Sequence, residues 1–171
     1  MITIETERML LRELDWDDIE NLQGIFSDPV AMRYYRSTKD IHETFEWIEL
    51  SRASYKVYHF GMWAAILKES QTFVGQCGLV MQRVEDLPEV ELGYLFLRKY
   101  WGQGLATEAA KACRDYALHR LQYERLISLI HPGNFPSKRV AEKVGMKFEK
   151  EVEFLDRQVC LYGLGARTVP E

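Results

Sequence analysis

The chain has 171 residues, of which 47% are hydrophobic and 28% charged, and its formal net charge is −4. This length and composition predict one soluble domain with a single core. The acidic balance argues against a nucleic-acid surface. The sequence has no long apolar run and no charged leader, which argues against a membrane span and a secretory signal. We therefore expect a cytoplasmic protein without nucleic-acid or membrane partners.

The first third of the chain predicts one strand and two helices. Alternating apolar and charged residues predict a strand over 2–13. Asp15 precedes an acidic turn, which favours the start of a helix that ends near residue 26. Asp40 is the expected cap of a second helix over 41–55, where apolar residues share one face.

The rest of the chain predicts alternating strands and helices. Segments rich in β-branched and aromatic residues are typical of strands, and they cover 59–67, 72–81, 90–97, 125–130, 147–155 and 158–164. Helices are expected over 103–121 and 137–144, and Gly145 suits the C-terminal cap of the second. The order of elements predicts a single α/β domain over 1–171 with a mixed sheet.

The cysteines give no sign of a disulfide or a metal. The chain has three of them, Cys77, Cys113 and Cys160. They lie far apart and form no Cys-x-x-Cys pair, so the pattern indicates neither a disulfide framework nor a zinc site. We expect no bound metal, and cysteines that are buried as small apolar residues.

The most informative segment is a strand, a glycine-rich turn and a helix in direct succession. Gly102 and Gly104 permit backbone amides to point inward, and the first turn of the following helix leaves amides unpaired and partly positive. Together they predict a cradle for a phosphate or pyrophosphate. A P-loop is absent, and a dinucleotide-binding fingerprint fails at Thr107. The alternative is a tight turn that binds nothing.

A family resemblance rests on this turn. The run Lys99-x-x-Gly102-x-Gly104 resembles the Gln/Arg-x-x-Gly-x-Gly/Ala motif with which the GNAT superfamily of N-acetyltransferases binds acetyl-CoA. Lys99 departs from the motif, because lysine keeps the positive charge but lacks the planar fork of arginine. More closely, the chain resembles the ribosomal-protein N-terminal acetylase (RimJ/RimL-like) branch over about 3–163, through the stretches 6–12, 91–94, 100–109 and 134–146.

The resemblance implies a fold, a cosubstrate and an acceptor. The fold is a mixed, mostly antiparallel sheet with two splayed central parallel strands and flanking helices. The cosubstrate is acetyl-CoA, and the acceptor is a primary amine, either the α-amine of a protein or that of a small molecule. Members often form dimers, so a homodimer is a further expectation from analogy.

The resemblance also assigns the residues that bind acetyl-CoA. Pantetheine is expected between the strands that end near 97 and 130, and the pyrophosphate on the amides of the cradle. The assigned residues are Leu95, Phe96, Leu97, Trp101, Gly102, Gln103, Gly104, Leu105, Ala106, Thr107, Asn134, Ser137 and Lys143. For Asn134 and Ser137 the alternative is that they only cap the following helix, and for Lys143 that it lies on a solvated face.

Catalysis needs a base, because amines are mostly protonated at neutral pH. Glu91 is the candidate, since its apolar neighbours on the strand should raise its pKa. The alternatives are that Glu91 is an ordinary strand carboxylate and that His131 is the base. A tyrosine that many relatives use as acid is replaced here by Ala141, and the branch suggests Ser137 as the partner of the leaving sulfur.

We expect direct transfer in a ternary complex. No cysteine is suitably placed for an acyl-enzyme, and a backbone amide near Tyr94 is the expected partner of the oxyanion. Because the tyrosine is missing, the alternative function is a non-catalytic sensor that binds acyl-CoA with the same fold.

Overall fold

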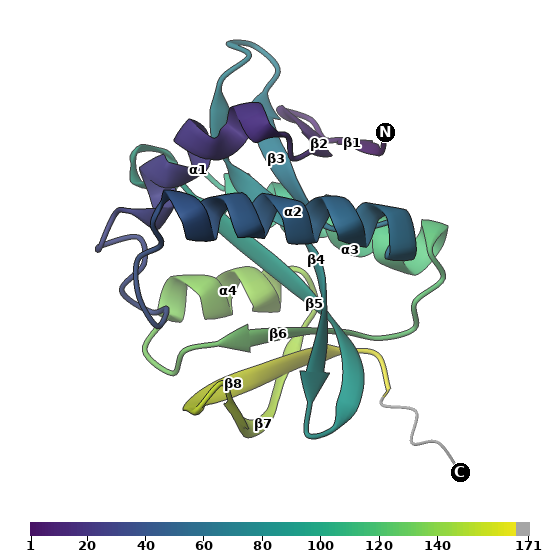
Figure 1. The fold of residues 1–171 in the computed structure, drawn as a ribbon. Coiled ribbons are helices and arrows are strands. Elements are labelled where there is room, and N and C mark those ends of the chain that lie inside the picture. The colour runs from purple at the N-terminus through teal and green to yellow at the C-terminus, as the bar shows by residue number, and fades with distance from the viewer. Residues whose placement is uncertain (167–171) are drawn as a thin grey trace.

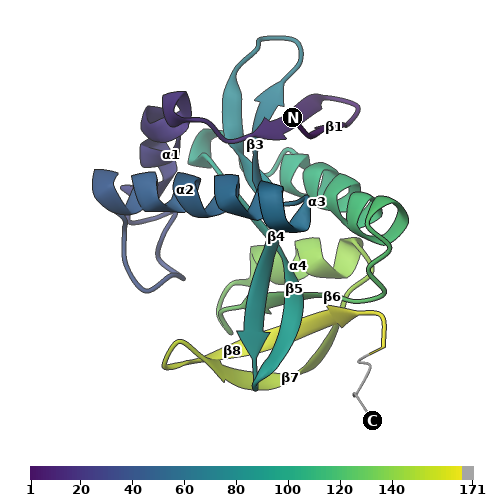
Figure 2. The ribbon, with the colours of Figure 1, turned by 45° about the vertical axis from the view of Figure 1, so that its right-hand side comes forward.

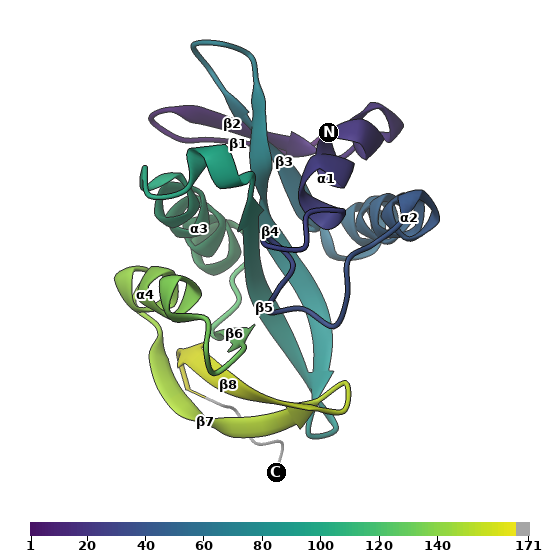
Figure 3. The ribbon, with the colours of Figure 1, turned by 90° about the vertical axis from the view of Figure 1, so that its left-hand side faces the viewer.

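The computed structural model describes residues 1–166, which form one sheet with helices on both faces. The strands are β1 (Thr3–Glu5), β2 (Met9–Glu13), β3 (Met62–Leu67), β4 (Phe73–Val84), β5 (Leu87–Phe96), β6 (Leu126–Ile130), β7 (Lys147–Phe154) and β8 (Arg157–Leu164). The helices are α1 (Ile19–Phe26), α2 (Ile41–Tyr58), α3 (Leu105–Asp115) and α4 (Phe135–Lys143). Figure 1 shows their arrangement, and Figure 3 shows α1 and α2 on one face of the sheet with α3 and α4 on the other.

The sheet is mixed and mostly antiparallel, as predicted. Its eight strands follow the order β1-β2-β3-β4-β5-β6-β8-β7, and the parallel pair is β5 with β6. These two strands are in register at a single position, Glu91 opposite Ile127. Next to this position the two strands are joined through side chains instead of by backbone pairing. Ser128 Oγ donates to the Leu92 carbonyl at 2.7 Å, and the Leu129 amide donates to Glu91 Oε1 at 3.3 Å. The splayed central pair is therefore confirmed.

The predicted strand over 2–13 is wrong, because the segment folds into the hairpin β1–β2. Ile4 lies opposite Leu11 in its register. The turn is closed by Thr6, whose amide donates to the Met9 carbonyl at 2.9 Å and whose Oγ1 accepts from the Met9 amide at 2.9 Å. A threonine turn of this kind lacks the glycine or proline by which turns are usually recognised.

The helix starts follow the predicted caps, while one helix is longer than predicted. The Asp40 carboxylate accepts from the Glu43 amide at 2.8 Å, and the Glu43 carboxylate accepts from the Asp40 amide at 2.8 Å, which is a capping box. α2 continues to Tyr58 and ends at His59, which has φ 59°. Asp15 likewise forms a capping box with Asp18, in a 3-10 turn ahead of α1.

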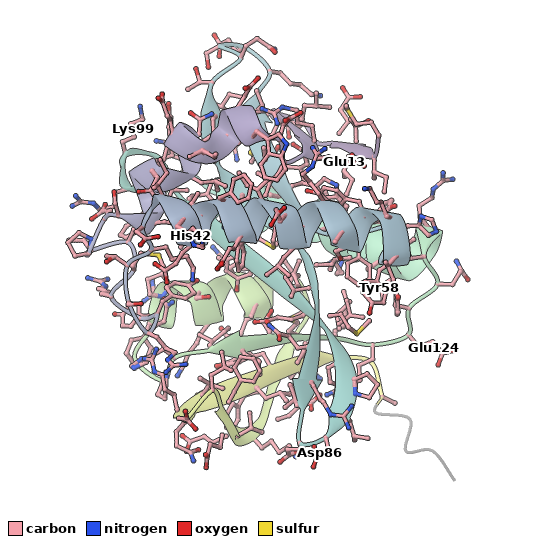
Figure 4. All side chains as sticks on the ribbon, in the orientation of Figure 1. Glu13, His42, Tyr58, Asp86, Lys99 and Glu124 are labelled. Atoms are coloured by element: carbon pink, nitrogen blue, oxygen red, sulfur yellow. The ribbon has the colours of Figure 1, made fainter. Side chains whose placement is uncertain are left out.

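Other boundaries also differ from the prediction: β3 begins at Met62 instead of residue 59, and α4 covers Phe135–Lys143 instead of 137–144. The β4–β5 hairpin is longer, because Glu85 and Asp86 form its turn with φ 49° and 64°, the conformation that suits a two-residue hairpin. Asp86 stands at the tip of this hairpin in Figure 4. The helix predicted over 103–121 is α3 only as far as Asp115, and it continues as a π-helical turn over Tyr116–Arg120.

Small residues let α3 pack closely on the sheet. Ala109, Ala110 and Cys113 of α3, together with Ala117 of the π-helical turn that follows, are fully buried in the larger core cluster. This packing fixes the N-terminus of α3 over the end of β5. All three cysteines are buried and free, as expected. Within residues 1–166, no helix combines the length and the apolar character needed to cross a membrane.

Candidate functional site

Two cavities meet where β5 and β6 separate. The α3 groove, of about 460 Å³, runs along the turn before α3 and the face of α4. The β5–β6 cavity, of about 320 Å³, lies between the loop that joins α1 to α2, the open end of β5–β6 and the β7–β8 turn. The residues common to both are Tyr34, Tyr35, Tyr94, Leu95, Asn134 and Ser137. A molecule in one cavity can therefore touch a molecule in the other.

The turn before α3, which lines the α3 groove, has the backbone geometry that the sequence predicts for an anion cradle. Gly102 and Gly104 have φ 75° and 78°, a conformation that other residues adopt only with strain. The amide of Glu108 donates to the Gly104 carbonyl at 3.0 Å and so begins the helical hydrogen bonding of α3. The amides of Leu105, Ala106 and Thr107 precede it at the positive end of the helix, where an anion satisfies them.

The cradle is tied to the N-terminal hairpin, which the sequence did not predict. The Glu108 carboxylate accepts from Thr6 Oγ1 at 2.6 Å, from the Arg8 amide at 2.8 Å and from Arg8 Nε at 2.6 Å. Arg8 also donates to the Gln103 carbonyl at 2.9 Å. Burial raises the pKa of Glu108, but these hydrogen bonds outweigh it and lower the pKa overall. The carboxylate is therefore charged at neutral pH and fixes the hairpin against the cradle.

Lys99, the first residue of the resemblance motif, points away from the cradle. Figure 4 shows it at the outer edge of the molecule, and its ammonium lies 5.1 Å from the centre of the Tyr100 ring. Trp101 is better placed, because it lines the α3 groove and its indole donates to the Phe96 carbonyl at 2.8 Å.

The backbone of β5 differs from the expectation at Leu95 and Leu97. The Leu97 amide donates to the Val74 carbonyl and its carbonyl accepts from the Tyr100 amide, both at 2.9 Å, so both groups are already used. Because backbone groups alternate in direction along a strand, those of Leu95 also face β4. The backbone groups of Tyr94 and Phe96 face the opposite way, towards the opening between β5 and β6.

The start of α4 combines a cap with a cavity wall. Asn134 Oδ1 accepts from the Ser137 amide at 3.2 Å, so Asn134 is the N-cap of this helix. Both residues nevertheless line both cavities. Arg139 and Lys143 follow on α4, and their exposed side chains line the α3 groove.

Tyr94 and Ser137 form a pair of hydroxyls at the junction of the cavities. Ser137 Oγ donates to the Tyr94 hydroxyl at 3.2 Å, and the Tyr94 hydroxyl donates to the Ser137 carbonyl at 2.7 Å. Burial raises the pKa of Tyr94, against the opposing effect of the bond from Ser137, so the phenol keeps its proton. The sequence analysis gave no role to the Tyr94 side chain, because its contact with α4 depends on the tertiary fold.

Glu91 lines the β5–β6 cavity, where its half-buried carboxylate is held from two sides. Gln82 Nε2 donates to Oε2 at 2.8 Å, and the Leu129 amide donates to Oε1 at 3.3 Å. Burial raises the pKa of Glu91 and is the largest effect, while the two hydrogen bonds oppose it. The direction agrees with the prediction and suits a group that must take up a proton.

His131, the rival base, is held in a less suitable state. Its Nδ1 accepts from the Gly133 amide at 3.0 Å, so the neutral imidazole carries its proton on Nε2. Its ring packs 5.2 Å from that of Tyr34. In this tautomer the nitrogen that is free of the backbone carries the proton and has no lone pair to offer, so the hydrogen bonding around the two residues favours Glu91 as the candidate base.

Comparison with known proteins decides the family. Residues 8–147 match the family described as the acetyltransferase (GNAT) domain. The chain belongs to the GNAT acetyltransferase family. This GNAT acetyltransferase is 40% identical to the uncharacterized protein YkkB of Bacillus subtilis over 158 residues, which is 92% of either chain. It is 29% identical to the uncharacterized N-acetyltransferase p20 of Bacillus licheniformis, over 88% of this chain and 84% of the relative.

Solved structures have the same fold. An acetyltransferase from Agrobacterium tumefaciens superposes with a TM-score of 0.86 and 27% identity, over 97% of this chain and 95% of that one. The RimL acetyltransferase of ribosomal L7/L12 in complex with coenzyme A superposes with a TM-score of 0.80 over 96% and 98% of the two chains. At 14% identity, the second match shows the fold alone.

Proposed function

We propose that this GNAT acetyltransferase moves the acetyl group of acetyl-CoA to a primary amine by direct attack in a ternary complex. The observation that carries the proposal is the meeting of the α3 groove and the β5–β6 cavity at Tyr94 and Ser137. Two substrates can be bound from opposite sides, with the candidate base on the wall of one cavity and a hydroxyl pair at the junction.

The α3 groove suits acetyl-CoA, which supplies an acetyl group activated as a thioester. The unpaired amides before Glu108 and the left-handed glycines suit its pyrophosphate, and the exposed Arg139 and Lys143 add positive charge beside it. Tyr94 and the Phe96 amide present backbone groups to pantetheine in place of Leu95 and Leu97, because the Phe96 carbonyl already accepts from the Trp101 indole. Trp101 and Asn134 line the same path.

The residues of the junction account for the proton transfers. The acceptor ammonium loses one proton to solvent, and its neutral nitrogen then forms a bond to the thioester carbon. Glu91 accepts the second proton, directly or through a water. As the carbon–sulfur bond breaks, the hydroxyls of Tyr94 and Ser137 donate hydrogen bonds to the sulfur, which ends as a thiol. The sulfur takes up one proton from solvent, and Glu91 returns its own proton there, so the products are an amide, the thiol of CoA and one released proton.

A turnover assay tests this proposal. Release of CoA thiol should require both the protein and an amine, and it should follow ternary-complex kinetics, with intersecting lines in double-reciprocal plots. Parallel lines, or an acetyl group trapped on the protein, would contradict direct attack. Binding of acetyl-CoA without turnover on a broad amine panel would instead favour a non-catalytic acyl-CoA sensor. Ala141 is consistent with that alternative, because it replaces the tyrosine that many relatives use as acid.

A further inference from the structure

We infer that the acceptor amine also carries a carboxylate, which Arg36, Lys39 and Arg157 bind at the outer part of the β5–β6 cavity. The inference rests on the proposed function and names the substrate class of the same site. It comes from the charges that line the cavity and from the elements that bring them together.

The lining of the β5–β6 cavity is positive, although the chain as a whole is negative. Arg36, Lys39 and Arg157 all line it, and Glu91 is the single acidic side chain among the described residues that do. None of the three cations forms an ion pair with a carboxylate within residues 1–166. Three cations without a carboxylate partner at one cavity repel one another, and an anionic ligand removes that cost.

Two segments far apart in sequence place these cations. Arg36 and Lys39 belong to the loop between α1 and α2, and Arg157 is the first residue of β8, after the turn at Leu155 and Asp156. This loop and the β7–β8 turn lie on the same side of the molecule in three views (Figures 1, 2 and 3). The cavity between them therefore has positive charge from both of its outer walls.

Lys39 is held in position rather than free in solvent. Its amide donates to the Phe26 carbonyl at 2.9 Å, and its ammonium lies 5.9 Å from the centre of the Trp47 ring. Trp47 is in turn fixed by a 2.9 Å hydrogen bond from its indole to Gln76, which is almost fully buried. A positioned cation gives up less conformational freedom on binding than a mobile one does.

The cavity is therefore suited to an acceptor with two different ends. The amine belongs near Glu91 and Tyr94, at the junction with the α3 groove. The carboxylate belongs near the guanidinium groups of Arg36 and Arg157, which can bind it through paired hydrogen bonds. A polyamine has the opposite charge pattern, because its distal ammonium groups would face the three cations and would find no carboxylate besides Glu91.

Matched acceptors test the inference. Each amino acid is compared with its amide, which differs only in the carboxylate, and kcat/KM is measured from thiol release. We expect the acids to exceed their amides by about tenfold or more, the effect of ~1.4 kcal/mol. In Arg157→Gln the acid-to-amide ratio should fall towards one. In Lys147→Gln, which removes a cation from an exposed position of β7 outside both cavities, the ratio should stay as in the wild type.

A second arm separates two sources of the carboxylate. Amide-capped peptides with Asp or Asn at the second position carry the carboxylate on a side chain instead of at the α-carbon of the acceptor. Preference for the free acids identifies a small amino-acid-like acceptor, and preference for the Asp peptides identifies an acidic peptide N-terminus. Both results support the carboxylate, whereas equal or better use of the amides, the Asn peptides or spermidine would overturn it while leaving the proposed function intact.

A binding measurement covers the case in which none of these amines is acetylated. N-acetyl amino acids and their amides resemble the product, and each is added to the protein with CoA. A larger rise in Tm with the acid, lost in Arg157→Gln, supports the inference, and equal or absent shifts overturn it. Titration of acetyl-CoA alone by calorimetry reports on the proposed function separately, because that ligand does not need the three cations.

Discussion

The α3 groove and the β5–β6 cavity are built in opposite ways. The groove relies on backbone: two left-handed glycines, the first amides of α3 and the part of β5 beyond its register pair with β6. The cavity relies on side chains from segments that are distant in sequence, including the α1–α2 loop, β4, β5 and the β7–β8 turn. A cosubstrate common to a family can be held by backbone geometry, while the acceptor is selected by side chains that each chain can vary. The following experiments test that division.

The largest effect is expected from Gly104→Glu. The substitution adds a side chain at φ 78° and a negative charge where the pyrophosphate is proposed to bind. Unfavourable placement of like charges costs several kcal/mol, so the affinity for acetyl-CoA in calorimetry should fall about 100-fold or more. Ser70→Glu, in the exposed turn between β3 and β4, is the matched control, and equal losses in both variants would exclude a specific cradle.

Glu91→Gln should separate chemistry from binding. The amide keeps the shape of the side chain but cannot accept a proton, so kcat should fall about 100-fold or more, the usual size of a general-base contribution. The dissociation constant of acetyl-CoA should stay within about threefold of that of the wild type, because the carboxylate lies on the other side of the junction. A full rate in the variant would assign the proton to water or another group.

Tyr94→Phe and Ser137→Ala should have moderate and unequal effects. Removing the Tyr94 hydroxyl takes away one donor and the partner of Ser137, and we expect about a tenfold loss of kcat, or ~1.4 kcal/mol. Ser137→Ala should cost less, because the tyrosine hydroxyl remains. The double variant measures their coupling, and strictly additive losses would show that the two hydroxyls act independently.

Gln82→Leu should shift the pH dependence of the rate. The hydrogen bond from Gln82 lowers the pKa of Glu91 against the larger, raising effect of burial. Its loss raises the pKa further, and the base form exists only above the pKa. The acidic limb of the kcat profile should therefore move to higher pH, while an unchanged limb would mean that Glu91 does not control it.

Glu108→Gln should have the smallest effect on binding and a visible effect on stability. The amide loses the charge-assisted bonds to Arg8, and because the Arg8 side chain is 43% exposed we expect this to cost about 1 kcal/mol or less. We expect a lower free energy of unfolding in denaturant titrations and an affinity for acetyl-CoA reduced about twofold to fivefold. Glu142→Gln, on the exposed side of α4, serves as the control.

The same division explains what the sequence predicted. The cradle at Gly102 and Gly104 is a contiguous motif, and the small residues of α3 share one helical face, so local pattern was sufficient. For Glu91 the sequence predicted the raised pKa but not the hydrogen-bond partners of the carboxylate. Its partners Gln82 and Leu129 come from two other strands, and the pairing of Tyr94 with Ser137 spans 43 residues. Such contacts are fixed by tertiary packing, which a single sequence does not reveal.

The backbone directions at Leu95 and Leu97 were not predicted, for a similar reason. Whether Leu95 or Phe96 faces the opening depends on the register of β5 against β4, and a shift of one residue reverses the direction of every backbone group. The hairpin at Thr6 was missed because its stabilising partner, Glu108, lies about 100 positions along the chain. Register and long-range side-chain partners therefore limit what composition and periodicity predict.

The single register pair between β5 and β6 leaves a gap in the sheet that pantetheine is proposed to fill. A ligand that binds only the folded chain raises stability by RT ln(1 + [L]/Kd), about 2.7 kcal/mol at a concentration of 100 Kd. The cosubstrate would then act as a structural part of the protein. Resistance to proteases should rise with the acetyl-CoA concentration, which links the lifetime of the chain to the metabolic supply of its own acetyl donor.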